Sequence, residues 1–200
     1  MNIVFDLGGV VFEWQPDKII SGLFNDEKIK QLIKQQIFQH PDWLELDRGT
    51  LTTEQAILRG VKRTQLSHAE ISQLFHAVPA SLTPLEETVE LIRYLASTSN
   101  KLYVLSNIQQ ASIDYLQQNH SFWHLFDGKV FSCQIHKIKP EPEIYQYLLD
   151  KHKLEANKTI FIDDMQENLQ AASNFGIKTI HFTNAKQCHQ ELIEKGAIKQ

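Results

Sequence analysis

The stretch Ile3-Val4-Phe5-Asp6-Leu7-Gly8-Gly9 determines how the rest of the chain is interpreted. Three successive apolar residues without alternation indicate a strand that is buried on both faces, and the two glycines indicate a tight turn after it. In open α/β folds, ligands bind beyond the carboxyl ends of the strands, which is where Asp6 stands. The stretch therefore predicts an α/β protein with a polar site at Asp6.

Three similar apolar runs follow further along the chain, and each ends in polar residues. They are Leu102–Leu105 before Ser106 and Asn107, Thr159–Ile162 before Asp163 and Asp164, and Thr179–Phe182 before Thr183 and Asn184. Helical patterns separate these runs, with apolar residues that share one face over 85–95 and over 144–149. Alternating strands and helices predict a parallel sheet with helices on both faces.

The segment 15–82 has no strand pattern, and its apolar residues recur at helical spacing. We therefore predict two parts, an α/β core formed by 1–14 and 83–200 and an all-helical insertion over 15–82. Capping boxes at Ser67–Glu70 and Thr83–Glu86 predict two helix starts, and Asp47-Arg48-Gly49 predicts a turn inside the insertion.

Composition excludes several classes of function. The 200 residues carry a net charge of −4, and their densest basic stretch is Lys62-Arg63, so we expect no nucleic acid partner. No run is long and apolar enough for a membrane span, and the N-terminus lacks the basic region of a secretory signal. Cys133 and Cys188 stand alone, as is typical of a reducing compartment. We expect a cytoplasmic protein without membrane contact.

Polar residues at the strand ends would share one crevice if the strands are neighbours. They are Asp6, Ser106, Asn107, Asp163 and Asp164, and Lys139 can reach them from Lys137–Pro140. Carboxylates of this kind suit Mg²⁺, which takes one or two protein carboxylates and leaves positions for water and a substrate phosphate. A carboxylate in line with a neutralised phosphorus can attack it and form an aspartyl-phosphate.

Four segments in this order carry a family resemblance over almost the whole chain. They are Phe5–Val10, Val104–Asn107, Lys139–Tyr145, and Phe161–Asp164 with Asn168. They resemble the motifs of the haloacid dehalogenase-like hydrolase superfamily. The first motif, Asp-Leu-Gly-x-Val, is similar to the branch that includes bacterial α-glucose-1-phosphate phosphatases. The resemblance implies a Rossmann-like core in three layers, a helical cap inserted after the first strand, and Mg²⁺-dependent hydrolysis of phosphate monoesters.

The resemblance also implies roles for individual residues. Asp6 would be the nucleophile and a metal ligand, with the Gly8 carbonyl and Asp164 as further ligands and Asp163 as a ligand or a support. The phosphate would be held by Ser106, Asn107, Lys139 and the backbone at Gly9. Asn168 would lie behind these groups.

One departure from the family pattern concerns proton transfer. Relatives have an aspartate two residues after the nucleophile as general acid and base, and this chain has Gly8 there. Such a residue is worth ~10²–10⁴-fold in rate. Glu13 or Asp17 could serve instead, and Arg48 could reach the substrate from the cap. His136 replaces a common glycine near Lys139.

Three functions remain open at this point. The first is a phosphatase for a small phosphorylated metabolite, most plausibly a sugar phosphate, because a helical cap excludes macromolecules. The second is a metal-independent dehalogenase that uses Asp6 on carbon, against which the Asp163-Asp164 pair argues. The third is a non-catalytic phosphate-binding or regulatory relative, suggested by Gly8. The oligomeric state stays open.

Overall fold

A five-stranded parallel sheet forms the centre of the computed structural model, which describes residues 1–198. The strands are β1 (Asn2–Phe5), β2 (Lys101–Ser106), β3 (Gly128–Phe131), β4 (Thr159–Asp163) and β5 (Lys178–His181), in the spatial order β3-β2-β1-β4-β5. Every neighbouring pair is parallel. The predicted parallel α/β sheet is confirmed, and β1 lies at its centre, between β2 and β4.

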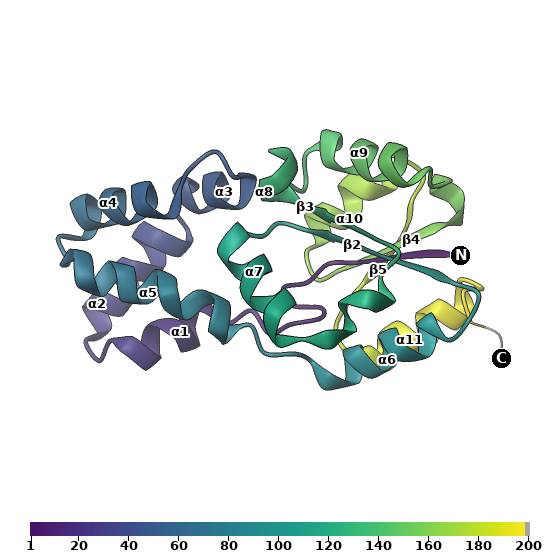
Figure 1. Ribbon diagram of the computed structural model, residues 1–200, viewed down its shortest axis with the longest axis horizontal. Helices are drawn as coiled ribbons and strands as arrows, with labels where there is room; N and C mark the ends of the chain where they lie inside the picture. Colours follow the sequence, from purple (N-terminus) through teal and green to yellow (C-terminus); the bar gives the residue numbers. More distant parts are fainter. Residues whose placement is uncertain (199–200) are drawn as a thin grey trace.

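Helices cover both faces of the sheet, which gives three layers (Figure 1). Alternation along β1 sends Ile3 and Phe5 to one face and Val4 to the other. The first face packs against α6 (Glu86–Ala96), α7 (Gln110–Asn119) and α11 (Ala185–Glu194), and the second against α9 (Pro142–His152) and α10 (Gln166–Ser173). Short elements complete this part: α8 (Ser132–Ile135), η2 (Ser121–Leu125) and η3 (Ala156–Lys158).

The chain between β1 and α6 forms a helical insertion, defined here as 16–81, which extends away from the sheet (Figure 1). It contains α1 (Pro16–Leu23), α2 (Glu27–Ile33), the π-helical η1 (Lys34–Phe38), α3 (Pro41–Arg48), α4 (Thr53–Thr64) and α5 (His68–Ser81). Its apolar residues form a core of their own around Ile33, Ile71 and Leu74. The helical insertion is therefore a packed unit, and its amphipathic helices do not depend on the sheet for burial.

Several local predictions were wrong or incomplete. The sequence patterns did not indicate β3, because Gly128–Phe131 is short and contains Lys129. Thr83 does not cap α6, which begins at Glu86, since Pro84 pairs with Phe12 in an isolated β-bridge. The predicted turn at 47–49 is instead the last turn of α3, which Gly49 ends with a left-handed conformation. The Ser67 capping box is confirmed.

Both cysteines are buried and unbonded, as expected for core residues. Among the described residues, no helix is both long and apolar enough to cross a membrane.

Candidate active site

A cavity of about 630 Å³ lies between the carboxyl ends of β1, β2 and β4 and the helical insertion. The core side contributes Asp6, Ser106, Asn107, Lys139, Asp164 and Asn168, and the helical insertion contributes Trp43, Leu44, Asp47, Arg48 and Val78. A cavity of this size can enclose most of a small organic ligand. The structure thus brings the strand-end residues together on one floor, with helical residues facing them.

Three carboxylates meet at this floor. Asp6, Asp163 and Asp164 each offer an oxygen, and these atoms all lie within 4.8 Å of one another. The Lys139 Nζ lies 2.8 Å from Asp6 Oδ1 and 2.7 Å from Asp163 Oδ2. One ammonium group against three carboxylates leaves an excess of negative charge when all are ionised. The donor set therefore suits a small divalent cation with hard oxygen ligands.

Burial strongly perturbs the protonation of these groups. It raises the pKa of Asp6 to about 7 although Lys139 lowers it, and Asp163 and Asp164 raise it further. Burial also raises the pKa of Asp164, and repulsion from Asp163 adds to it. Burial opposes the charge of Lys139, but its attraction to Asp6 and Asp163 is stronger and raises its pKa. Near neutral pH, Asp6 is therefore partly protonated, and a bound cation would favour its ionised form.

Asp163 holds its neighbours in place. Its side chain is fully buried and accepts hydrogen bonds from Lys139 Nζ (2.7 Å), the Met165 amide (2.8 Å) and Asn168 Nδ2 (3.0 and 3.1 Å). Tyr145 in turn donates to the Asn168 carbonyl (2.9 Å). Both Asp163 oxygens are thus already engaged, which suits a supporting role better than direct contact with a ligand.

The loop after β2 is tied to the loop that carries Lys139. Asn107 Nδ2 donates to the Lys139 carbonyl (2.9 Å), and the Lys139 amide donates to Asn107 Oδ1 (2.8 Å). Ser106 ends β2 and is almost fully buried at the cavity. These contacts tie the loop after β2 to Lys139, whose ammonium group lies beside Asp6 and can bind an anion.

The two glycines after Asp6 differ in conformation. Gly9 has φ +75°, and a Cβ there would collide with the Asp164 carboxylate, so this position needs glycine. The Gly9 amide donates to the Phe12 carbonyl (2.8 Å) within the turn. Gly8 lines the cavity without a left-handed φ, and a Cβ there would meet only Trp14 Cβ at 3.6 Å. The backbone at Gly8 therefore does not require glycine.

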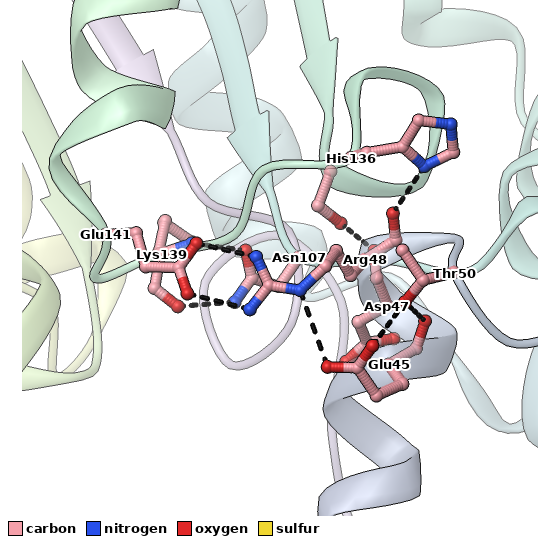
Figure 2. Close-up of polar contacts among 9 residues, drawn as sticks. Glu45, Asp47, Arg48, Thr50, Asn107, His136, Lys139 and Glu141 are labelled. Atoms are coloured by element: carbon pink, nitrogen blue, oxygen red, sulfur yellow. Dashed lines mark hydrogen bonds and ion pairs between the residues drawn. The ribbon is translucent and has the colours of Figure 1, made fainter.

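The end of α3 is anchored to the core (Figure 2). Arg48 donates to both Glu141 oxygens, at 2.6 and 2.7 Å, and its Nε lies 3.5 Å from Glu45. The Arg48 carbonyl lies 3.0 Å from His136 Nδ1, and the Asp47 carbonyl accepts from Ser132 Oγ. Arg48 thus lines the cavity, but its charge is already balanced by Glu141.

Two predicted substitutes for the missing acid lie off the cavity. Glu13 pairs with Lys18 at 3.6 Å, and the exposed Asp17 pairs with Lys34 at 2.9 Å. Sequence reasoning missed Asp47, which lines the cavity from α3. Burial raises the pKa of Asp47 to about 7, although a hydrogen bond with Gln109 lowers it. No sequence signal singled out Asp47, since helical periodicity does not say which residue faces a site.

The fold and this carboxylate floor place the chain in a known class. Residues 3–182 match the model of the haloacid dehalogenase-like hydrolase family, and the chain belongs to that family. The resemblance of the four motifs is thereby confirmed at the level of the superfamily.

Two curated relatives of similar length are phosphatases. The chain is 28% identical over 94% of its length to a sesquiterpene phosphatase of Aspergillus oryzae, 93% of which is covered. It is 26% identical to a D-ribitol-5-phosphate phosphatase of Bacteroides thetaiotaomicron, with 96% of each chain covered.

Among solved structures, a family enzyme of Bacteroides thetaiotaomicron matches with a TM-score of 0.77 at 22% identity, covering 96% of this chain and 97% of that one. The same wild-type enzyme with magnesium and inorganic phosphate matches with a TM-score of 0.67 at 20% identity, covering 91% and 93% of the two chains. These likenesses support the shared fold.

Proposed function

We propose that this protein is a Mg²⁺-dependent phosphatase for a small phosphorylated metabolite, with Asp6 as the nucleophile. The observation that carries the proposal is the meeting of Asp6, Asp163, Asp164 and Lys139 on the floor of a cavity of substrate size. The two phosphatase relatives of similar length support the reaction class. The helical insertion would act as the cap that encloses the substrate.

Asp6, Asp164 and the Gly8 carbonyl would hold the cation, and Asp163 would keep Lys139 and Asn168 in position. When bound, Mg²⁺ supplies positive charge that lets a phosphate approach the carboxylate of Asp6. Ser106 and Lys139 would bind the phosphate oxygens, since both line the cavity with Asp6. Asn107, whose side chain is bonded to the Lys139 backbone, would mainly hold that loop in position. Gly9 contributes by its conformation, which brings the turn close to Asp164.

In the chemical step, an Asp6 oxygen attacks phosphorus, and the bond between phosphorus and the alcohol oxygen breaks. This step gives an aspartyl-phosphate and an alkoxide that needs a proton. Water then attacks the phosphorus of the aspartyl-phosphate, loses a proton, and releases inorganic phosphate from Asp6. Both proton transfers need an acid and base that Gly8 cannot supply.

We assign these proton transfers to Asp47. Among the described residues of the helical insertion, Asp47 is the one whose carboxyl group lines the cavity. It lies near enough to Asp6 for repulsion between the two carboxylates to contribute to its raised pKa. Asp47→Asn should lower kcat ~10²–10⁴-fold on alkyl phosphates and much less on aryl phosphates, whose leaving groups need little protonation. An equal loss on both substrate classes would remove Asp47 from proton transfer.

The reaction class is tested with p-nitrophenyl phosphate. We expect hydrolysis with Mg²⁺, none after exhaustive chelation, and none by Asp6→Asn, whose amide cannot act as an anionic nucleophile. Hydrolysis by a pure Asp6→Asn protein would contradict the proposed nucleophile.

Two other functions predict no hydrolysis of p-nitrophenyl phosphate, and each has an assay of its own. A dehalogenase would release halide from 2-haloacids without metal, and a non-catalytic relative would bind phosphate with Mg²⁺ but release none from an ester. For the substrate, the relatives point in two directions: D-ribitol-5-phosphate phosphatase favours a polyol or sugar phosphate, and sesquiterpene phosphatase favours an apolar alcohol.

A further inference from the structure

The wall of the cavity above the phosphate floor is mainly apolar. The side chains that form it are Phe12, Trp14, Trp43, Leu44, Val78 and Leu82, from the segment after β1, from α3 and from the end of α5. Trp14 is 36% exposed and Leu44 is 49% exposed, although both face a cavity. Apolar surface left open to water in this way gains free energy when an apolar group covers it.

The aromatic part of this wall is held in place by its own packing. The Trp43 ring lies 5.8 Å from the Trp14 ring, 4.7 Å from Phe38 and 5.9 Å from Phe75, centre to centre. Rings packed in this way keep their orientation, so the wall is shaped before a ligand arrives.

The two charged groups that lie beside the wall as an ion pair, Arg48 and Glu141, already satisfy each other. Arg48 makes two hydrogen bonds to Glu141 (Figure 2). A sugar in this space would bury several hydroxyl groups, and each hydroxyl that finds no partner costs binding energy. A hydrocarbon group makes no such demand.

We propose that the apolar wall binds the alcohol part of the substrate, and that this substrate is a phosphate monoester of an apolar aliphatic alcohol. This inference rests on the proposed phosphatase function and specifies its substrate class. The phosphate lies on the floor beside Asp6 and Lys139, and the hydrocarbon chain extends past Asp47 toward Leu44 and Trp43. Leu44 is then a specificity-determining residue.

The test is a series of n-alkyl phosphates from ethyl to octyl, kept below their micelle concentrations, with Mg²⁺. We expect kcat/KM to rise about fourfold for each methylene until the wall is covered, which corresponds to ~0.8 kcal/mol per buried methylene. Glucose 1-phosphate and ribitol 5-phosphate should both be hydrolysed with a lower kcat/KM than hexyl phosphate. A flat alkyl series, or a polyol phosphate as the better substrate, would overturn the inference.

A matched pair of variants distinguishes a specific effect of the cavity wall from a general effect of replacing an exposed leucine. Leu44→Gln places an amide in the cavity and should flatten the dependence of kcat/KM on chain length. Leu58→Gln makes the same change at an equally exposed leucine, 49% in both cases, on α4 outside the cavity lining. It should leave the series as in the parent protein. An unchanged chain-length dependence in Leu44→Gln would remove Leu44 from the substrate site.

Binding measurements distinguish failure of this inference from failure of the phosphatase proposal. Trp14 and Trp43 report on the wall by fluorescence, and Trp123 is buried in the core. Tighter binding of octyl than ethyl phosphate, lost in Leu44→Gln, supports the apolar wall even if no ester is hydrolysed. Hydrolysis of p-nitrophenyl phosphate together with equal binding of octyl and ethyl phosphate would refute the wall alone.

Discussion

Neutralising Asp6, the proposed nucleophile, should make the protein more stable when a chelator keeps metal away. Asp6 is buried beside Asp163 and Asp164, and its pKa rises from 3.8 to about 7 with Lys139 already present. An acid with a raised pKa takes up a proton on folding at any pH between the two values, so stability falls as the pH rises through that interval. The amide in Asp6→Asn is uncharged at every pH and avoids this cost.

The size of the effect follows from the pKa values. A tenfold change in protonation corresponds to ~1.4 kcal/mol, so ionised Asp6 destabilises the metal-free native state by ~4 kcal/mol at pH 8. At pH 5, native Asp6 is mostly protonated, and its remaining cost is ~2 kcal/mol. For a chain of 200 residues, ~4 kcal/mol corresponds to an increase of about 10 °C in Tm.

The assay is urea unfolding of the parent protein and Asp6→Asn at pH 5 and pH 8, with a chelator present throughout. Comparing the two proteins at one pH cancels the cost of burying Asp47, which both share, but not the repulsion between Asp47 and Asp6, which Asp6→Asn also removes. Asp42→Asn is a control in which the change in the free energy of unfolding should have the opposite sign. Burial alone would raise the pKa of Asp42, but hydrogen bonds from Arg63 and Arg59 lower it, so losing this charge should destabilise. An Asp6→Asn protein no more stable than its parent at pH 8 would refute the reasoning.

The remaining predictions concern the metal, Gly8 and Gly49. Mg²⁺ at 100 times its Kd should raise the free energy of unfolding of the parent protein by ~2.7 kcal/mol. The Asp164→Asn protein should lose most of that gain when both are unfolded in urea with Mg²⁺. Gly8→Ala should melt near the parent temperature, because its Cβ meets only Trp14; a drop of several degrees would contradict this. Gly49→Ala should destabilise by ~2 kcal/mol or more in urea unfolding, because the left-handed Gly49 lies against the Cys133 backbone, and a parent-like midpoint would contradict this.

Local sequence patterns were sufficient for the sheet and for the floor of the site. Buried parallel strands are apolar along their whole length, so the runs that became β1, β2 and β4 were recognisable, and the residues that end them had to meet at one edge. β3 was missed because its four residues begin with Gly128 and Lys129. A short strand of this kind is defined by its pairing with β2, which no local pattern records.

The wall of the site could not be predicted in the same way. Arg48 and Glu141 are 93 residues apart in sequence, and only the packed structure shows that each balances the charge of the other. Asp47 sits one residue before Arg48 on the same helix, yet it lines the cavity with a different partner, Gln109. Helical spacing predicts which residues share a face, but it does not say what that face meets.

The charges on the floor imply an order of binding. Lys139 Nζ lies within 2.8 Å of carboxylate oxygens on Asp6 and Asp163, so its charge is shared between them. A phosphate that entered this site would face the three carboxylates with a single ammonium group to offset them. A cation held by Asp6 and Asp164 would relieve that repulsion and leave Lys139 able to turn part of its charge toward the phosphate. We therefore expect the cation to bind before the substrate, with Asp163 keeping Lys139 in place through the exchange.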